Sequence, residues 1–180
     1  MKVFISWAGK STEAFALELH NWIKPALSLD SWCSAAAECL PQGGSASGGF
    51  VQAIFEGIDT SNFCILVMTR ESIERPWLNF EAGAFYGQKK TVFTLLCGDI
   101  THSHLAKTSH PTSASGMNHT TFSKDGLTRI FTAILANHRD SATVSKMVDR
   151  WFSDIETKYN KIFNQRFNDI TDALATDCDD

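Results

Sequence analysis

The sequence predicts an α/β fold, namely a flavodoxin-like open parallel sheet of about five strands in the order 2-1-3-4-5, with helices on both faces. First, short apolar runs alternate along the chain with segments whose apolar residues recur at helical spacing. Second, the run Phe63–Met68 is continuously apolar, as strands covered on both faces are. Third, the chain enters a strand-like run, Val3–Ser6, almost at once. Ligands of such sheets bind beyond the carboxyl ends of the strands.

The first half of the chain is expected to contain three strands separated by two helices. Val3–Ser6 leads into a helix that Ser11 or Thr12 caps. The apolar residues of this helix recur every three or four positions: Phe15, Leu19, Trp22, Ile23 and Ala26. A second strand at Leu29–Cys33 precedes a long Ala/Gly/Ser loop, 35–49, of a length that is usually functional. The next helix and strand are marked by Phe50, Ile54, Phe55 and Ile58, and then by Phe63–Met68.

The second half is expected to add two strands, three helices and a polar connection. A helix that begins at Pro76 is followed by a strand at Thr91–Leu96. Residues 98–123 are polar, and we expect irregular structure there with a short edge strand near Thr120. The last two helices are marked by apolar residues at helical spacing: Leu127, Ile130, Phe131 and Ile134, then Val144, Val148, Trp151, Ile155, Tyr159 and Ile162.

The composition is that of one globular domain. The 180 residues are 43% hydrophobic and 20% charged. We expect a domain at 1–140, an amphipathic helix at 141–172 packed on it, and an acidic tail at 173–180. The net charge of −4 disfavours a nucleic-acid partner, and no run predicts a signal peptide or a membrane span. Five cysteines without a Cys-x-x-Cys pair predict reduced thiols in a cytoplasm, with Cys64 and Cys97 buried in strands.

The run Pro76–Phe85 carries a single charge, Glu81, among mostly apolar residues. Burying a lone carboxylate is costly, so such a group is usually paired, shifted in pKa or kept for chemistry. Trp77 lies four residues earlier and therefore on the same helix face. An aromatic side chain beside an acid can hold a flat cationic ring. The pattern equally allows Glu81 to be an acid favoured by the helix dipole, or a partner of Arg70 or Arg75.

Other patterns in the chain are weaker or exclude a class of function. Gly9–Ser11 looks like the end of a P-loop, but that motif needs a glycine at position 4, where the chain has Phe. Backbone N–H groups at this helix start can still contact a phosphate, although a capping turn is the simpler interpretation. A phospho-acceptor receiver needs acids where the first and third strands end, and the chain has Ser6–Trp7 and Met68–Thr69 there. Nothing specific supports a flavin site, and there is no Gly-x-Ser-x-Gly elbow for a serine hydrolase.

The histidines and the aromatic residues are expected to be structural or exposed. Four histidines lie between 102 and 119 without a nearby cysteine or a pair of carboxylates to complete a metal site, so we expect none. The Trp, Phe and Met side chains are expected to lie in the core, apart from Trp7 and Trp77 at the ends of elements.

Three segments together resemble the Toll/interleukin-1 receptor (TIR) domain family, in particular its bacterial members. Val3–Trp7 is similar to the opening strand of the family, and Trp32–Ser34 is similar to the strand that precedes the BB loop. Ser61–Ala84 is similar to the third strand and the helix after it, with Pro76, Trp77 and Glu81 in the family's pattern. The resemblance runs from residue 1 to about 135.

This resemblance implies an activity. Enzymatic TIR domains cleave NAD+ at the nicotinamide–ribose bond, and their catalytic glutamate lies four residues after a tryptophan, as Glu81 does after Trp77. NAD+ is then the substrate, no cofactor is needed, and the product is ADP-ribose or a cyclic or other signalling derivative. The resemblance also implies a role in bacterial antiphage defence, a form of innate immunity in which a separate effector senses the product.

The family further suggests which residues bind the substrate and how subunits associate. The expected substrate-binding residues lie at the ends of the first two strands and on the helix of Glu81: Phe4, Ile5, Ser6, Trp7, Lys10, Trp32, Ser34 and Trp77. Members often form homo-oligomers through TIR–TIR contacts, in which the BB loop of one subunit completes the neighbour's site.

Two other functions stay open at this point. A non-catalytic TIR adaptor would act by self-association and would need neither Glu81 nor Trp77. A nucleotide-sensing module could use the same crevice without chemistry. Release of nicotinamide from NAD+ by the purified protein separates the enzyme from both.

Overall fold

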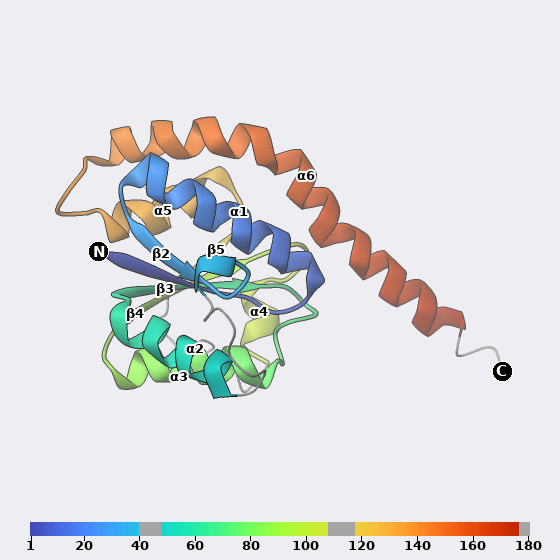
Figure 1. Ribbon diagram of the computed structural model, residues 1–180. Coiled ribbons are helices and arrows are strands. Elements are labelled where there is room, and N and C mark those ends of the chain that lie inside the picture. Colours follow the sequence, from blue (N-terminus) through green and yellow to red (C-terminus); the bar gives the residue numbers. More distant parts are fainter. Residues whose placement is uncertain (40–47, 108–117, 177–180) are drawn as a thin grey trace.

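A computed structural model describes residues 1–39, 48–107 and 118–176, with side chains up to residue 164. Five parallel strands form one sheet in the order β2-β1-β3-β4-β5, which confirms the predicted fold class (Figure 1). The strands are β1 (Lys2–Ser6), β2 (Asp30–Cys33), β3 (Phe63–Met68), β4 (Thr91–Leu96) and β5 (Asn118–Thr121). The helices are α1 (Lys10–Leu27), α2 (Gly48–Thr60), α3 (Pro76–Gly87), α4 (His102–Leu105), α5 (Lys124–Ile134) and α6 (Ser141–Thr176).

Helices cover both faces of the sheet, and a separate apolar core lies under each layer. Helices α1, α5 and α6 cover one face, and α2 and α3 cover the other (Figure 1). Successive side chains of a strand point to opposite faces. In β1, Val3 and Ile5 therefore enter the α1 side, while Phe4 packs on the α3 side. Ser6, two residues after Phe4, also faces α3, which places its hydroxyl next to that helix.

Helix α1 begins earlier than the predicted cap. Its N-cap is Gly9, whose φ of 91° lies in the region that favours glycine. The Thr12 hydroxyl donates to the Ala8 carbonyl (2.8 Å), and the Ser11 hydroxyl lies 3.4 Å from the Glu71 carboxylate. Neither side chain caps the helix, so the prediction of Ser11 or Thr12 as cap is wrong, because the glycine turns the chain into the helix sooner.

Smaller differences from the expected elements occur around β2 and β4. Strand β2 begins at Asp30 rather than at Leu29. The expected loop 35–49 contains a short 3-10 turn at Ala37–Cys39, and residues 40–47 of that loop lie outside the described residues. Cys64 is buried in β3 as predicted, whereas Cys97 is buried directly after the end of β4.

Helix α6 packs its N-terminal half against the α1 side of the domain. The apolar side chains from Val144 to Phe163 share one core with α1 and α5. Trp151 stacks on Trp22 of α1, with ring centroids 4.2 Å apart. The ring of Phe15 contacts four other aromatic rings, those of Phe122, Trp151, Tyr159 and Phe163. The helix extends to Thr176, beyond the predicted end at 172, and its last turns project past the body of the domain (Figure 1).

Three aromatic residues that were expected in the core lie on the surface instead. Phe50 and Phe55 of α2 are 40% and 42% exposed, and Phe80 of α3 is 39% exposed. The prediction is wrong here because helical spacing identifies an apolar face without saying whether a neighbour covers it. Within the described part of the chain, no helix has the length and apolar composition that crossing a membrane requires.

Candidate active site

Glu81 lies on α3 with its carboxyl group against the carboxyl end of β1. Pro76 opens the helix, where its fixed φ suits the first turn and its missing N–H removes no helical hydrogen bond. Glu81 follows in the second turn and is only 4% exposed. The hydroxyl of Ser6, the last residue of β1, donates a hydrogen bond to Oε2 of Glu81. The end of the strand and the helix therefore meet at this acid.

The environment of Glu81 moves its titration towards neutrality. Burial raises the pKa of Glu81 from its ordinary value of 4.5 to about 7, although hydrogen bonds from Ser6 and Trp77 lower it in part. Burial therefore outweighs the two donors. A carboxyl group with this pKa is present in both protonation states near pH 7 and can act there as an acid, a base or a charged stabiliser.

The alternative that Glu81 pairs with a nearby arginine is not what the structure shows. Arg70 forms an ion pair with Asp99, with 2.6 Å between Nη2 and Oδ2. Arg75 lies 4.0 Å from the carboxylate of Glu71. The hydrogen-bond donors to Glu81 are neutral groups, so its charge is not cancelled by a neighbouring guanidinium.

Cys64, which was predicted only to be buried in a strand, also belongs to the surroundings of Glu81. It is paired in register with Phe4 on the α3 side of the sheet. Burial, and after it the charge of Glu81, raise the pKa of the Cys64 thiol well above its ordinary value. The thiol is therefore protonated at neutral pH. Strand periodicity together with the pairing of β1 and β3 identifies this neighbour, and the pairing is not visible in the sequence.

The other expected site residues divide between the two faces of the sheet. Trp77 is 39% exposed, so part of its ring is open beside Glu81. Phe4 is fully buried and stacks on Trp32, with centroids 4.6 Å apart and planes within 9°. Ile5 and Trp7 pack on the opposite face, away from α3. The structure thus brings together Ser6, Trp77 and Glu81, and places Phe4 and Trp32 in the adjoining core.

Two further expected residues lie at the rim of the sheet. Lys10 is exposed at the first position of α1, and Ser34 is half-buried in the turn after β2. The Glu71 carboxylate lies close to Gly9, since a Cβ added there would come within 3.0 Å of Oε1. A carboxylate at this helix start already occupies its positive end, which disfavours a phosphate there.

The histidines on α4 and β5 form a pair rather than a metal cluster. His102 and His119 lie with their Nδ1 atoms 3.3 Å apart, and His104 Nδ1 accepts from the Thr101 N–H at the start of α4. His110 lies outside the described residues. Among the residues with a defined placement, no three His, Cys, Asp or Glu side chains gather as metal ligands.

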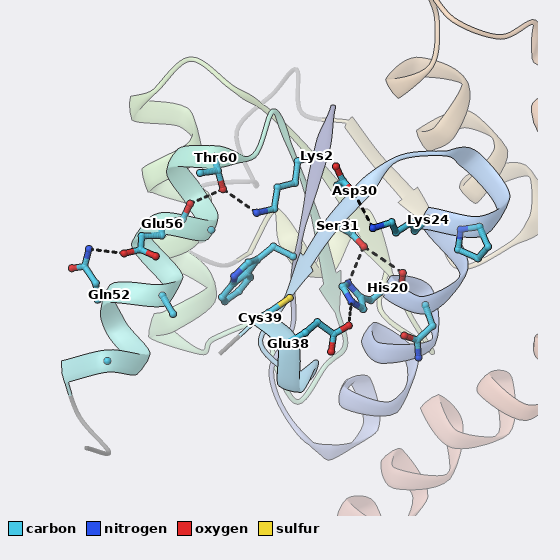
Figure 2. Close-up of a pocket in the computed structure, with 16 residues that line it drawn as sticks. Lys2, His20, Lys24, Asp30, Ser31, Glu38, Cys39, Gln52, Glu56 and Thr60 are labelled. Atoms are coloured by element: carbon cyan, nitrogen blue, oxygen red, sulfur yellow. Dashed lines mark hydrogen bonds and ion pairs between the residues drawn. The ribbon is translucent and has the colours of Figure 1, made fainter. Parts of the chain in front are cut away.

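A pocket of about 840 Å³ opens along the outer edge of β2, between α1 and α2 (Figure 2). Of the expected site residues, only Trp32 lines it. Neither Glu81 nor Trp77 belongs to its lining. This pocket is therefore distinct from the cluster around the acid.

The sheet order agrees with a comparison against protein families. Residues 3–131 match the family model described as the TIR domain, which spans the fold from β1 into α5. A search of curated proteins found no match to this chain. The family match covers well over half of the 180 residues. The chain therefore belongs to the TIR domain family.

Proposed function

We propose that this TIR domain is an NAD+ glycohydrolase or cyclase, which cleaves the nicotinamide–ribose bond to give ADP-ribose or a signalling derivative of it. The observation that carries the proposal is the buried carboxyl of Glu81, with its pKa raised to about 7 and its donors Ser6 and Trp77. A group of this kind in a domain whose family includes NAD+-cleaving members supports chemistry rather than a structural role. In this proposal the product acts in bacterial antiphage defence through a separate effector.

The proposed chemistry needs an acid of this type. The nicotinamide ring is cationic in NAD+ and departs as a neutral molecule. As it departs, positive charge develops on the ribose. A fixed carboxylate next to the ribose stabilises that charge, an electrostatic effect worth about 3–4 kcal/mol where single groups have been removed from active sites. Glu81 supplies the carboxylate, and ribose hydroxyls can donate to it beside Ser6. The open part of the Trp77 ring can stack on the departing ring.

The pH dependence of the reaction tests this assignment. The ionised carboxylate is the active form, so nicotinamide release from NAD+ should rise with pH and reach its midpoint near 7. Ser6→Ala removes a donor that favours the ionised form, and therefore moves the midpoint to higher pH. Chromatography of nicotinamide over about pH 5.5–8.5 measures both effects. Ser153→Ala, at an exposed position of α6, is the control and should keep the wild-type midpoint. A rate that does not change with pH would contradict the role of Glu81.

A second candidate function, self-association as an adaptor, is favoured by an exposed aromatic patch. We define this patch by its residues on α2 and α3: Phe50, Val51, Phe55, Trp77 and Phe80. The rings of Phe55 and Phe80 lie 5.6 Å apart, and those of Trp77 and Phe80 lie 5.3 Å apart, so these three side chains form a continuous centre of the patch. Contiguous exposed apolar surface usually marks an interaction site. Because TIR domains commonly self-associate, we propose a second copy as its partner.

The double variant Phe55→Ser/Phe80→Ser tests the patch as a contact between copies. Both side chains lie on the surface, outside the two cores, so the fold should persist while the mass measured by light scattering falls to that of the monomer. Melting temperature is the control for folding. Association without nicotinamide release would favour the adaptor, and an unchanged mass in the variant would exclude the patch as the contact. Since Trp77 belongs to both the patch and the candidate site, loss of release together with loss of mass would link assembly to chemistry.

A further inference from the structure

A groove along the outer edge of β2 is formed by residues outside the candidate active site. It has a volume of about 840 Å³, with α1 forming one wall, α2 the other, and β2 the floor (Figure 2). Its lining includes neither Glu81 nor Ser6. The proposed NAD+ chemistry therefore does not explain this pocket, and a different ligand has to be considered for it.

The floor of the groove presents backbone groups that have no hydrogen-bond partner in the part of the chain that the structure describes. Strand β2 pairs with β1 and, within the described ranges, with no strand on its other side. The N–H of Asp30 donates to the Met1 carbonyl (3.2 Å), so by alternation Ser31 and Cys33 direct their backbone groups outward. Cys33 is already engaged, since its N–H lies 3.5 Å from Cys39 Sγ and its carbonyl accepts from the following turn (3.0 Å). Ser31 thus offers one N–H and one C=O to the groove, as open strand edges do.

The two walls are held in place by their own contacts. On the α1 side, His20 Nδ1 lies 2.8 Å from Ser31 Oγ and Nε2 lies 3.0 Å from the Glu38 carboxylate. On the α2 side, the helix packs closely on the ring of Trp32. A Cβ added at Gly57 of α2 would come within 2.7 Å of that ring. An extended chain laid beside β2 would direct alternate side chains towards these two walls. The groove therefore has the form that an added strand requires.

The α2 side of the groove carries two charges that have no ion-pair partner among the described residues. One is Glu56 on α2 itself, and the other is Lys2, whose side chain reaches α2 from the start of β1. The Lys2 ammonium donates to the Thr60 hydroxyl (3.1 Å), and Glu56 accepts from the Gln52 amide (3.3 Å). Thr60 follows Glu56 by one helical turn, a rise of about 6 Å. Residues two apart in an extended peptide point the same way and lie about 6.7 Å apart. An acid and a base at such positions match the two charges.

The depth of the groove favours a single strand over a second copy of this domain. Side chains of α1 and α2 line both sides of it, so β2 is recessed between the helices. A second copy would have to bring its own recessed β2, with the same helices beside it, into that depth. One extended strand, with a strand spacing of about 4.8 Å, needs no such clearance.

We propose that the groove binds a short extended peptide segment of a partner protein, hydrogen-bonded to the backbone of Ser31 and carrying an acidic and a basic residue two positions apart. This is strand addition at a sheet edge, in which the main chain gives affinity and the alternate side chains give specificity. Because Ser31 is the one residue of β2 whose outward backbone groups have no partner among the described residues, the contact is short. The charged pair then supplies much of the selectivity.

A displayed library of random seven-residue peptides, selected on the full chain, tests the charge match. Enriched peptides should carry an acid and a base separated by one residue. Lys2→Gln and Glu56→Gln should each weaken their binding about fivefold, the effect of one partly exposed charge pair. Arg129→Gln and Glu156→Gln, at exposed positions of α5 and α6, are matched controls and should change binding less than about twofold.

Two substitutions at Ser31 test the backbone contact. Ser31→Pro removes the outward N–H at a position where an edge strand tolerates proline. Ser31→Val keeps that N–H and, like the proline, replaces the hydroxyl that faces His20 by an apolar side chain. Binding should be at least about fivefold weaker in the proline variant than in the valine variant, the effect of one hydrogen bond. Melting curves establish that both fold. No enriched peptide, equal binding by the two variants, or hydrogen-exchange protection in α3 instead of β2 would overturn the proposal.

Discussion

Replacing Glu81 by glutamine is expected to lower nicotinamide release from NAD+ by at least about a hundred- to a thousandfold. Glutamine has nearly the same shape and can still accept from Ser6, so the site keeps its packing and loses its negative charge. In the proposed reaction the charge stabilises a developing cation on the ribose, and no other acid among the described residues hydrogen-bonds to Ser6. Single-turnover assays with purified protein and chromatographic detection of nicotinamide measure the loss.

Glu74→Gln is the matched control for this substitution. Glu74 is exposed in the turn before α3, so the change removes the same charge near the same helix without touching the buried cluster. We expect its rate to stay within about twofold of the wild type. A Glu81→Gln protein that retained a tenth or more of the activity, or a Glu74→Gln protein that lost it, would show that the acid has been misassigned.

Replacing Phe15 by alanine is expected to destabilise the fold by about 3–5 kcal/mol. Phe15 is fully buried in α1, and its ring contacts aromatic rings both from α6 and from the segment after β5. Removing it leaves a cavity between elements that are far apart in the sequence. For a chain of this length, the melting temperature should fall by roughly 10 °C, as thermal unfolding followed by circular dichroism would show.

Phe55→Ala supplies the comparison, because it deletes the same atoms from a residue that is 42% exposed. Its effect on the free energy of unfolding should stay below about 1 kcal/mol. The shared core includes α6, which lies beyond the part of the chain that matches the family. If the two variants had the same melting temperature, α6 would not form a cooperative core with α1.

Much of the fold could be predicted from the sequence, because its strands carry a strong local signal. Phe63–Met68 and Thr91–Leu96 are continuous apolar runs, and both form strands with those bounds. The start of α1 was missed, since a serine and a threonine looked like caps while the backbone turn depended on Gly9. The surface position of Phe55 and Phe80 was missed for a different reason. Apolar periodicity marks a face, and only the tertiary arrangement decides what covers it.

Part of the candidate site could also be predicted from the sequence, and part could not. The spacing of Trp77 and Glu81 is local, so a helical pattern was enough to place them on one face. The hydroxyl of Ser6 and the thiol of Cys64 come from strands β1 and β3. Their approach to the Glu81 carboxyl depends on the pairing of these two strands. Phe4 was expected beside the substrate but stacks on Trp32 in the core. The alternation of side chains along a strand predicts that Phe4 and Ser6 lie on the same face of the sheet. It does not predict which of the two contacts the acid at the edge of the sheet.

The protonation of Glu81 also bears on how firmly the chain stays folded. Between its ordinary pKa of 4.5 and its value of about 7 here, the folded state holds a proton that the unfolded state releases, so the free energy of unfolding decreases as pH rises through this range. At about 1.4 kcal/mol per pKa unit, the full difference is about 3.5 kcal/mol. A laboratory lineage selected only for heat resistance in alkaline medium would therefore be expected to discard this acid early, since its ionisation weakens the very fold that carries it.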